Sequence, residues 1–335
     1  MKKAVIGIDV SFKEFHACFL LNGENARHKV VATRSFKNSE AGAEEMLKWV
    51  EKHNKLGLPV SYVMEATGCY YENLAYHLYE KGENVFVVLA NRMKNYFRSF
   101  NIKTKTDKVD AKVIAKYGIE RAIEPWEPMS VEYKSIRDLG RELLSLKKDM
   151  NRARNQLHAI KYSHKKAEMV KELKMEQIIL YEKSIKLIKK EIKALVDADD
   201  DLKLKIDKLQ TIPCIGFETA ILIVSETNGF KLFKNIRQLV SYAGLDVSHN
   251  ESGNHIGKSK ISKRGNSRIR RVLFMPALSA TVHNPSIKNL HERICERNPN
   301  IKRKGVVASM RKLLIFAYVV WKKDEAFQAN YKWVA

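Results

Sequence analysis

The spacing of apolar residues changes along the chain and separates regions with different predicted structures. In the first third, short runs of β-branched and aromatic residues alternate with amphipathic stretches, which is typical of strands and helices that follow one another. The predicted strands are 3–10, 15–21, 29–36, 60–64 and 85–90, and the predicted helices are 44–53, 71–79 and 107–121. Three strands followed by alternating helices and strands predict a mixed α/β sheet.

The middle of the chain has the apolar spacing of a coiled coil. Apolar or small residues recur at alternating intervals of three and four through 136–160 and again through 178–195. Neither glycine nor proline occurs between Gly140 and Pro213, so we expect two long helices that are joined near 163–175. A hairpin within one chain and a coiled coil between two chains both satisfy this pattern.

The last third is predicted to be mainly helical. An Ile-Pro-Cys-Ile-Gly sequence at 212–216, followed by the apolar stretch 220–226, is the pattern of a helix-hairpin-helix turn that binds a DNA phosphate. A turn that only joins two helices fits equally well. The apolar run 313–321 predicts a buried terminal helix, because a membrane span needs about 20 residues. The expected domains are 1–128, 129–205 and 206–335.

The balance of charge identifies the kind of partner to expect. The 335 residues include 61 Lys and Arg against 38 Asp and Glu, a net charge of +23, and 45% of them are hydrophobic. This apolar fraction excludes a disordered basic tail, and the positive charge favours salt-dependent binding to phosphate backbones. The aromatic residues Tyr96, Phe97 and Phe100 lie among cations, but their helical spacing favours core packing over stacking on RNA bases.

The four cysteines give information about the cellular compartment. They are widely spaced and match neither a zinc-ligand pattern nor a disulfide framework. An acidic residue interrupts the apolar stretch at the N-terminus, so a signal peptide is not expected. We therefore expect a cytoplasmic protein that does not span or bind a membrane.

Four carboxylates lie where a metal site could form. Asp9 lies at the end of the first predicted strand, Glu65 at the end of the fourth, and Asp107 and Asp110 are three residues apart on one helix. Mg²⁺ takes oxygen ligands, and two-metal phosphoryl transfer needs carboxylates that flank both ions. Each residue alone also has an ordinary explanation, as a strand end, an ion-pair partner or an acidic residue at a helix N-terminus.

The sequence around these carboxylates resembles the DEDD transposases of the insertion-sequence-110 family. The matching segments, which follow one another along nearly the whole chain, are 7–11, 65–70, 105–111, 212–216, 239–245, 251–253 and 261–265. The first domain of this family is similar to RuvC Holliday-junction resolvases. The resemblance therefore implies an α/β RuvC-like (ribonuclease H-like) domain, followed by a helical coiled-coil hairpin and a mainly helical C-terminal domain.

The resemblance also implies chemical roles for five residues. Asp9, Glu65, Asp107 and Asp110 would bind Mg²⁺ or Mn²⁺, and Ser252 would attack a DNA phosphate to form a covalent phosphoserine link. The active site would be composite, assembled from two protomers of a dimer or tetramer. A noncoding bridge RNA would pair with donor and target DNA and so select the sequence.

A basic segment beside the serine suits the same reaction. Seven cations, with no acidic residue among them, could hold a phosphate backbone; they are Lys258, Lys260, Lys263, Arg264, Arg268, Arg270 and Arg271. No adjoining Ser/His/Asp order activates Ser252, so metal-binding carboxylates from elsewhere would meet that need. Ser262 is the second candidate nucleophile. His255 is close enough in sequence to act as a proton shuttle, but the interpretation as an ordinary loop histidine is favoured.

Two other functions remain as alternatives. A junction-resolving nuclease would use the four carboxylates with a metal-activated water, but it leaves the coiled coil and the C-terminal domain unexplained. A non-catalytic architectural protein would use the basic surfaces, but it leaves four gathered carboxylates without a purpose. We expect a DNA transposase that uses both the carboxylates and Ser252.

Overall fold

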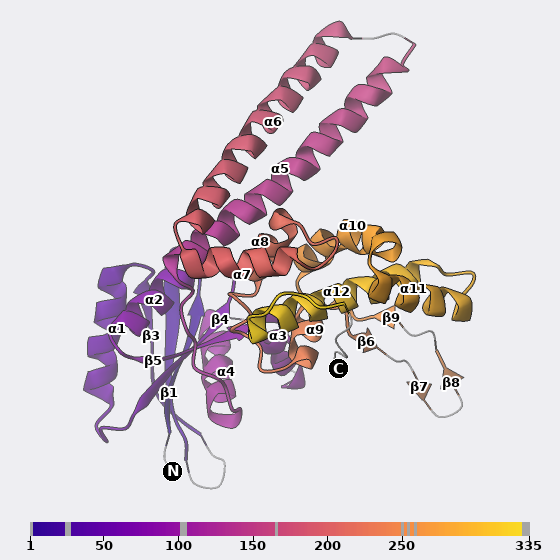
Figure 1. Ribbon diagram of the computed structural model, residues 1–335. Helices are drawn as coiled ribbons and strands as arrows, with labels where there is room; N and C mark the ends of the chain where they lie inside the picture. Colours follow the sequence, from indigo (N-terminus) through magenta and orange to yellow (C-terminus); the bar gives the residue numbers. More distant parts are fainter. Residues whose placement is uncertain are drawn as a thin grey trace. The chain divides into compact units, whose positions relative to one another are not determined.

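The protein forms two compact units, Met1–Pro128 and Met129–Ala335 (Figure 1). The computed structural model describes residues 3–23, 28–100, 106–164, 167–248, 251–252, 255–257 and 260–329. Among these residues, none of the helices has both the length and the apolar content that a membrane crossing requires.

The first unit is a five-stranded mixed sheet with helices on both faces (Figure 1). Its strands are β1 (Ala4–Val10), β2 (Glu14–Leu21), β3 (Lys29–Lys37), β4 (Val60–Ala66) and β5 (Asn84–Leu89). Their order is β3-β2-β1-β4-β5, in which β1, β2 and β3 are antiparallel neighbours and β4 and β5 continue parallel to β1. The helices are α1 (Glu40–His53), α2 (Glu72–Glu80), α3 (Ala90–Ser99) and α4 (Asp107–Glu120). The predicted mixed α/β sheet is confirmed.

Alternate residues of β1 build two separate cores. Its even-numbered residues pack with α1 and α2, whereas Val5 packs with α3 and α4. Gly7 faces α4 so closely that a Cβ atom there would lie 2.1 Å from the backbone nitrogen of Ala115. A Cβ on Gly118 would lie 2.9 Å from Val5. Helix α4 therefore runs antiparallel to β1 in backbone contact, which glycine permits because it has no side chain.

Two predicted boundaries in this unit differ from the structure. Strand β4 continues to Ala66 because it pairs with β5 as far as Leu89, so Glu65 lies inside the strand and not at its end. Helix α1 begins at Glu40, earlier than predicted, because the Ser39 hydroxyl accepts a hydrogen bond from the Gly42 backbone N–H at 3.2 Å. An N-cap of this kind satisfies a donor that the helix itself leaves unpaired.

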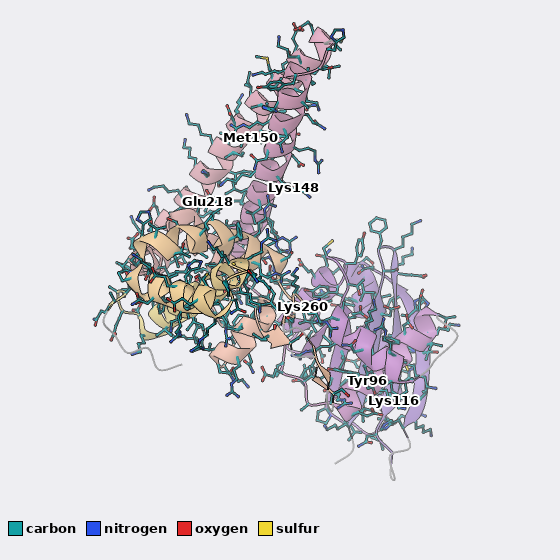
Figure 2. The ribbon with its side chains drawn as sticks, turned by 90° about the vertical axis from the view of Figure 1, so that its right-hand side faces the viewer. Tyr96, Lys116, Lys148, Met150, Glu218 and Lys260 are labelled. Atoms are coloured by element: carbon teal, nitrogen blue, oxygen red, sulfur yellow. The ribbon has the colours of Figure 1, made fainter. Side chains whose placement is uncertain are left out.

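The aromatic residues of α3 pack inward. Tyr96, labelled in Figure 2, is 7% exposed. Its ring makes edge contacts with Phe100 and Tyr117, and its hydroxyl donates a hydrogen bond of 2.6 Å to Glu120. Phe97 is partly buried in the same core. The core interpretation of these residues is confirmed.

The second unit begins with an antiparallel helical hairpin, α5 (Val131–Lys161) and α6 (Glu168–Asp197) (Figure 1). The apolar or small residues that recur at intervals of three and four through 136–160 and 178–195 are all buried or half-buried. The predicted hairpin within one chain is therefore confirmed. The connection occupies 162–167, a shorter stretch than 163–175. Near the base of the hairpin, Glu218 forms ion pairs with Lys147 and Lys189, which come from different helices of the hairpin (Figure 2).

The remainder of the second unit is mainly helical, as predicted, with short strands between residues 247 and 261. Its elements are α7 (Asp200–Gln210), α8 (Phe217–Glu226), α9 (Ile236–Tyr242), β6 (Val247–Ser248), β7 (Glu251–Ser252), β8 (His255–Ile256), β9 (Lys260–Ile261), α10 (Ser267–His283), α11 (Pro285–Arg297) and α12 (Arg303–Lys323). Leu313 and Phe316 of α12 are fully buried, which confirms the predicted terminal helix. Between α7 and α8, Cys214 has a φ of 75°, a left-handed conformation that favours glycine.

Candidate active site

Asp9 and Glu65 lie on neighbouring parallel strands and face the same side of the sheet. Ile8 pairs with Met64 in the β1–β4 register, which places Asp9 and Glu65 one position further along each strand. The odd-numbered residues of both strands face α4, as the packing of Val63 shows. Because alternate side chains of a strand share a face, both carboxylates are directed toward the side that α4 covers. Both residues are partly buried.

Asp107 and Asp110 lie on the first turn of α4. The Thr106 hydroxyl caps this turn by accepting a hydrogen bond from a backbone N–H at 3.4 Å. Because α4 runs antiparallel to β1, with Ala111 and Ala115 against Gly7, its first turn lies toward the end of β1 that carries Asp9. The structure thus places the four predicted carboxylates toward one end of the α4 face. Asp107 is exposed and Asp110 is partly buried.

Two further residues in this region were missed by the sequence analysis. His16 on β2 pairs with Asp9 across the β1–β2 ladder, and its Nδ1 atom lies 3.7 Å from Oδ2 of Asp107. The candidate ligand atoms of Glu14, His16 and Asp107 all lie within 4.8 Å of one another. The available signal was that 14 and 16 are polar positions in an otherwise apolar strand.

The chemistry of these side chains fits a divalent cation. Three elements, β1, β4 and α4, supply carboxylate oxygens, which are the ligands that Mg²⁺ and Mn²⁺ prefer. The Asp107 side chain is 60% exposed, so a phosphate can reach this end of the sheet from solvent. The region has the donors and the access that metal-assisted phosphoryl transfer requires.

Ser252 lies in the second unit, on a short ribbon of paired strands. Strand β6 pairs with β9, and β7 pairs with β8 inside this outer pair, so the segment folds back on itself in two steps (Figure 1). Ser252 is exposed and pairs with His255 in the β7–β8 register. An exposed hydroxyl on such a ribbon is accessible to a large substrate.

Ser262, the second candidate nucleophile, is held in a different way. Its hydroxyl donates a hydrogen bond to the Asp246 carboxylate and accepts a hydrogen bond from the backbone N–H of Arg264 at 3.3 Å. Its backbone N–H also bonds to the Asp246 carbonyl. These contacts give Ser262 a structural role in its own loop.

The predicted basic segment divides into cations that stay exposed and cations that hold the fold. Lys260, Lys263, Arg264 and Arg271 are exposed. Arg270 donates hydrogen bonds to the carbonyls of Ala243 and Gly265, at 2.9 and 3.3 Å, so it stabilises the turn before α10. Arg268 is half-exposed, with Nε 3.9 Å from a Glu226 carboxylate oxygen. Lys258 lies outside the described residues.

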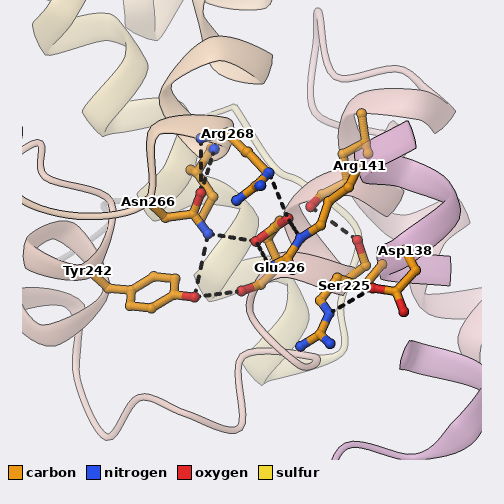
Figure 3. A network of polar contacts seen from close by, with 10 residues as sticks. Asp138, Arg141, Ser225, Glu226, Tyr242, Asn266 and Arg268 are labelled. Atoms are coloured by element: carbon orange, nitrogen blue, oxygen red, sulfur yellow. Dashed lines mark hydrogen bonds and ion pairs between the residues drawn. The ribbon is translucent and has the colours of Figure 1, made fainter. Parts of the chain in front are cut away.

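A buried carboxylate organises the start of α10 (Figure 3). The Glu226 side chain is only 3% exposed and receives two hydrogen bonds from Arg141 of α5, at 2.7 and 3.0 Å. It also accepts a bond of 2.7 Å from the Asn266 side chain, and its backbone carbonyl accepts one from the Tyr242 hydroxyl at 3.1 Å. Glu226 thus links α5, α8, α9 and the residue before α10.

The Asn266 side chain connects Glu226 to the basic segment. Its oxygen accepts hydrogen bonds from the backbone N–H groups of Arg268 and Ile269, which caps α10. The amide therefore bridges the buried Glu226 and the first turn of the helix that carries Arg268 and Arg271. Sequence analysis missed Glu226, although a single acidic residue at the end of an apolar helix is a signal for a buried partner.

Replacement of Glu226 by Gln is expected to destabilise the second unit by about 2 to 3 kcal/mol, because it weakens the charge-assisted hydrogen bonds with the partly buried Arg141. Burial raises the pKa of Glu226, but the hydrogen bonds and positive charge of Arg141, with help from Asn266 and Arg268, hold that pKa below its ordinary value. A lowered folded-state pKa adds stability above the ordinary glutamate pKa, and this stability is lost as pH falls through the folded-state value.

Denaturant unfolding between pH 7 and pH 3, followed by circular dichroism, measures this effect. The difference in unfolding free energy between the wild type and the Glu226→Gln variant should shrink as pH falls. Glu142→Gln, which removes an exposed carboxylate next to Arg141 on α5, is the matched control and should stay near the wild type. An equal loss at every pH would contradict the assignment of a charged Glu226.

Comparison with known protein families gives two matches in order along the chain. A model of the IS110 DEDD transposases matches residues 6–160, and a model of the IS116/IS110/IS902 transposase family matches residues 206–292. The first match includes all four carboxylates, and the second includes the serine and the basic segment.

The individual relatives include two gene-inverting proteins and a transposase. A pilin gene-inverting protein from Moraxella lacunata is 29% identical over 329 residues, which cover 98% of each chain, and one from Moraxella bovis matches to the same extent. The transposase for insertion sequence element IS1111A of Coxiella burnetii is 32% identical over 93 residues, 28% of this chain and 24% of the relative. The solved structure of Thermus thermophilus RuvC matches 38% of this chain and 100% of its own, at 14% identity and a TM-score of 0.29.

Proposed function

This chain belongs to the IS110 family of transposases, and from that premise we propose that it excises and inserts its mobile element through a covalent phosphoserine intermediate at Ser252. The family identifies the chain as a DNA recombinase. The observation that carries the proposal is the convergence of Asp9, Glu65 and the first turn of α4 on one end of a sheet. This region has the carboxylates for the reaction, and Ser252 in the other unit is exposed, as a nucleophile for a DNA phosphate would have to be.

The serine step exchanges one ester for another. The Ser252 Oγ atom forms a bond to phosphorus, a bond between phosphorus and a deoxyribose oxygen breaks, and that oxygen leaves as a hydroxyl after it takes up a proton. Rejoining is the reverse reaction, in which a deoxyribose hydroxyl of another strand attacks the phosphoserine and releases Ser252. The number of phosphate ester bonds is conserved, so strands can be exchanged without an external energy source.

The four carboxylates would hold divalent metal ions, for which we propose Mg²⁺, with Mn²⁺ as a substitute. When bound, such ions stabilise charge on the reacting phosphate and lower the pKa of a coordinated hydroxyl. The exposed cations Lys260, Lys263, Arg264 and Arg271 contact the phosphates on either side of the cleaved bond. Glu226 and Asn266 keep the start of α10 in place under them.

We propose three domains, 1–128, 129–205 and 206–335, in a composite assembly. In this account the carboxylates of one protomer act on the phosphate that Ser252 of another protomer attacks, in a dimer or tetramer. A noncoding bridge RNA pairs with donor and target DNA and selects the sites. The net charge of +23 supports the binding of both nucleic acids.

A recombination assay with mixed variants tests the composite site. The Asp9→Asn and Ser252→Ala proteins are each expected to be inactive with donor DNA, target DNA, Mg²⁺ and the RNA transcribed from the gene's flanks. Mixing them before assembly should restore recombination, because a mixed oligomer contains one intact pair of half-sites. Omission of the RNA should abolish the product. If mixing restores nothing while each variant still forms oligomers, each protomer completes its own site.

A further inference from the structure

We propose that Glu14, His16 and Asp107 form a binding site for a divalent transition-metal ion of the Zn²⁺ class, beside the four carboxylates of the family. This site differs from the four-carboxylate site in its ligands, because it includes an imidazole nitrogen from β2. It rests on the proposed function only through Asp107, which the two sites share.

The sheet places the three side chains together. His16 pairs with Asp9 across antiparallel strands, and side chains that are directly opposite each other share a face. Glu14 lies two residues earlier on β2 and therefore faces the same side. Asp107 is on α4, which packs on this same side of the sheet in backbone contact at Gly7. One strand, β2, and one helix, α4, thus supply the three ligands.

The distances suit a shared ion better than a direct bond. His16 Nδ1 and Asp107 Oδ2 are 3.7 Å apart, which is too long for a hydrogen bond between them. Ligand atoms on one metal ion, each bonded at about 2.0 to 2.2 Å, are separated by about 3 to 4 Å. The three candidate ligand atoms lie within 4.8 Å of one another, so small side-chain rotations bring them to that separation.

Burial and donor chemistry indicate the class of ion. The His16 side chain is 15% exposed and held by its strand, whereas Asp107 is 60% exposed and reachable from solvent. Histidine nitrogen and carboxylate oxygen are both ligands that Zn²⁺ binds in proteins. Mg²⁺ prefers oxygen ligands alone, so the histidine favours Zn²⁺ or Co²⁺ at this position.

Binding of Zn²⁺ to the full-length protein without nucleic acid tests this site, with a chromophoric chelator as competitor. The wild type should bind one ion that the His16→Gln variant binds at least tenfold more weakly, and Glu14→Gln should also weaken it. His77→Ala is the matched control, because His77 is another half-buried histidine beside a carboxylate, Glu44, at 3.0 Å in the same unit. It should bind as the wild type does.

A thermal melt supplies a second readout that is independent of activity. Zn²⁺ should raise the melting temperature of the wild type and of His77→Ala, each measured against the same protein without metal, but should not raise that of His16→Gln. Equal Zn²⁺ affinity in the wild type and His16→Gln would overturn the proposed site. Since no DNA is present, a failure here is separate from a failure of the proposed recombination, which the serine variant tests.

Discussion

Replacement of Ser252 by Ala is expected to abolish recombination and to remove every covalent protein–DNA species. The variant lacks the Oγ atom that is proposed to bond to phosphorus, and loss of a catalytic nucleophile lowers the rate by about a thousandfold or more. Ser252 is exposed on a short ribbon, so the loss of one hydroxyl should leave the fold and nucleic-acid binding unchanged. Gel separation under denaturing conditions, with labelled DNA, measures the adduct.

Ser262→Ala is the matched control for this prediction. It removes a hydroxyl from the same segment, but one that is bound to Asp246 and to the backbone of Arg264. We expect this variant to lose some stability and to retain the adduct. If the adduct persists in Ser252→Ala and disappears in Ser262→Ala, the nucleophile is Ser262 and not Ser252.

Asp9→Asn and Glu65→Gln are expected to lower cleavage at least about a hundredfold at saturating Mg²⁺. Each substitution keeps the shape of the side chain and removes one negative charge, which weakens the hold on a divalent ion and its stabilisation of the reacting phosphate. The two residues lie one position beyond the Ile8–Met64 pair on adjacent strands, so both should give the same defect. Titration of cleavage rate against Mg²⁺ and Mn²⁺ measures it.

Glu80→Gln is the control for these carboxylates. Glu80 is an exposed residue at the end of α2, which packs on the other face of the sheet, so this variant should keep the wild-type metal dependence. DNA binding should persist in all three variants, because the cations that hold the backbone are unchanged. If Asp9→Asn cleaves at the wild-type rate, the proposed role of the carboxylates is wrong.

The sequence predicted those features of the fold that repeat at short intervals. The strands of the sheet and the two long helices follow from local apolar spacing, and the structure confirms them within a few residues. The four carboxylates were found because each lies inside a family motif. Their common face follows from Gly7, whose missing side chain allows α4 to contact β1.

Features that depend on distant pairing were missed. His16 becomes a neighbour of Asp107 only after β2 pairs with β1 and α4 crosses the sheet, and no local pattern contains both residues. Glu226 and Arg141 are 85 residues apart, and a contact of this kind has no periodic signal. The shift of Glu65 from a strand end to its interior likewise depends on its partner strand, β5.

Identification of the DNA-linked residue is the sharpest test of the phosphoserine intermediate. The wild-type protein is incubated with Mg²⁺, the RNA and a DNA substrate, the covalent species is isolated, and its digested peptides are sequenced by mass spectrometry. We expect one modified peptide, with the phosphate on Ser252. Cleaved DNA without any modified peptide, or a phosphate on another residue, would contradict the phosphoserine mechanism, and the first of these results would identify a hydrolytic nuclease.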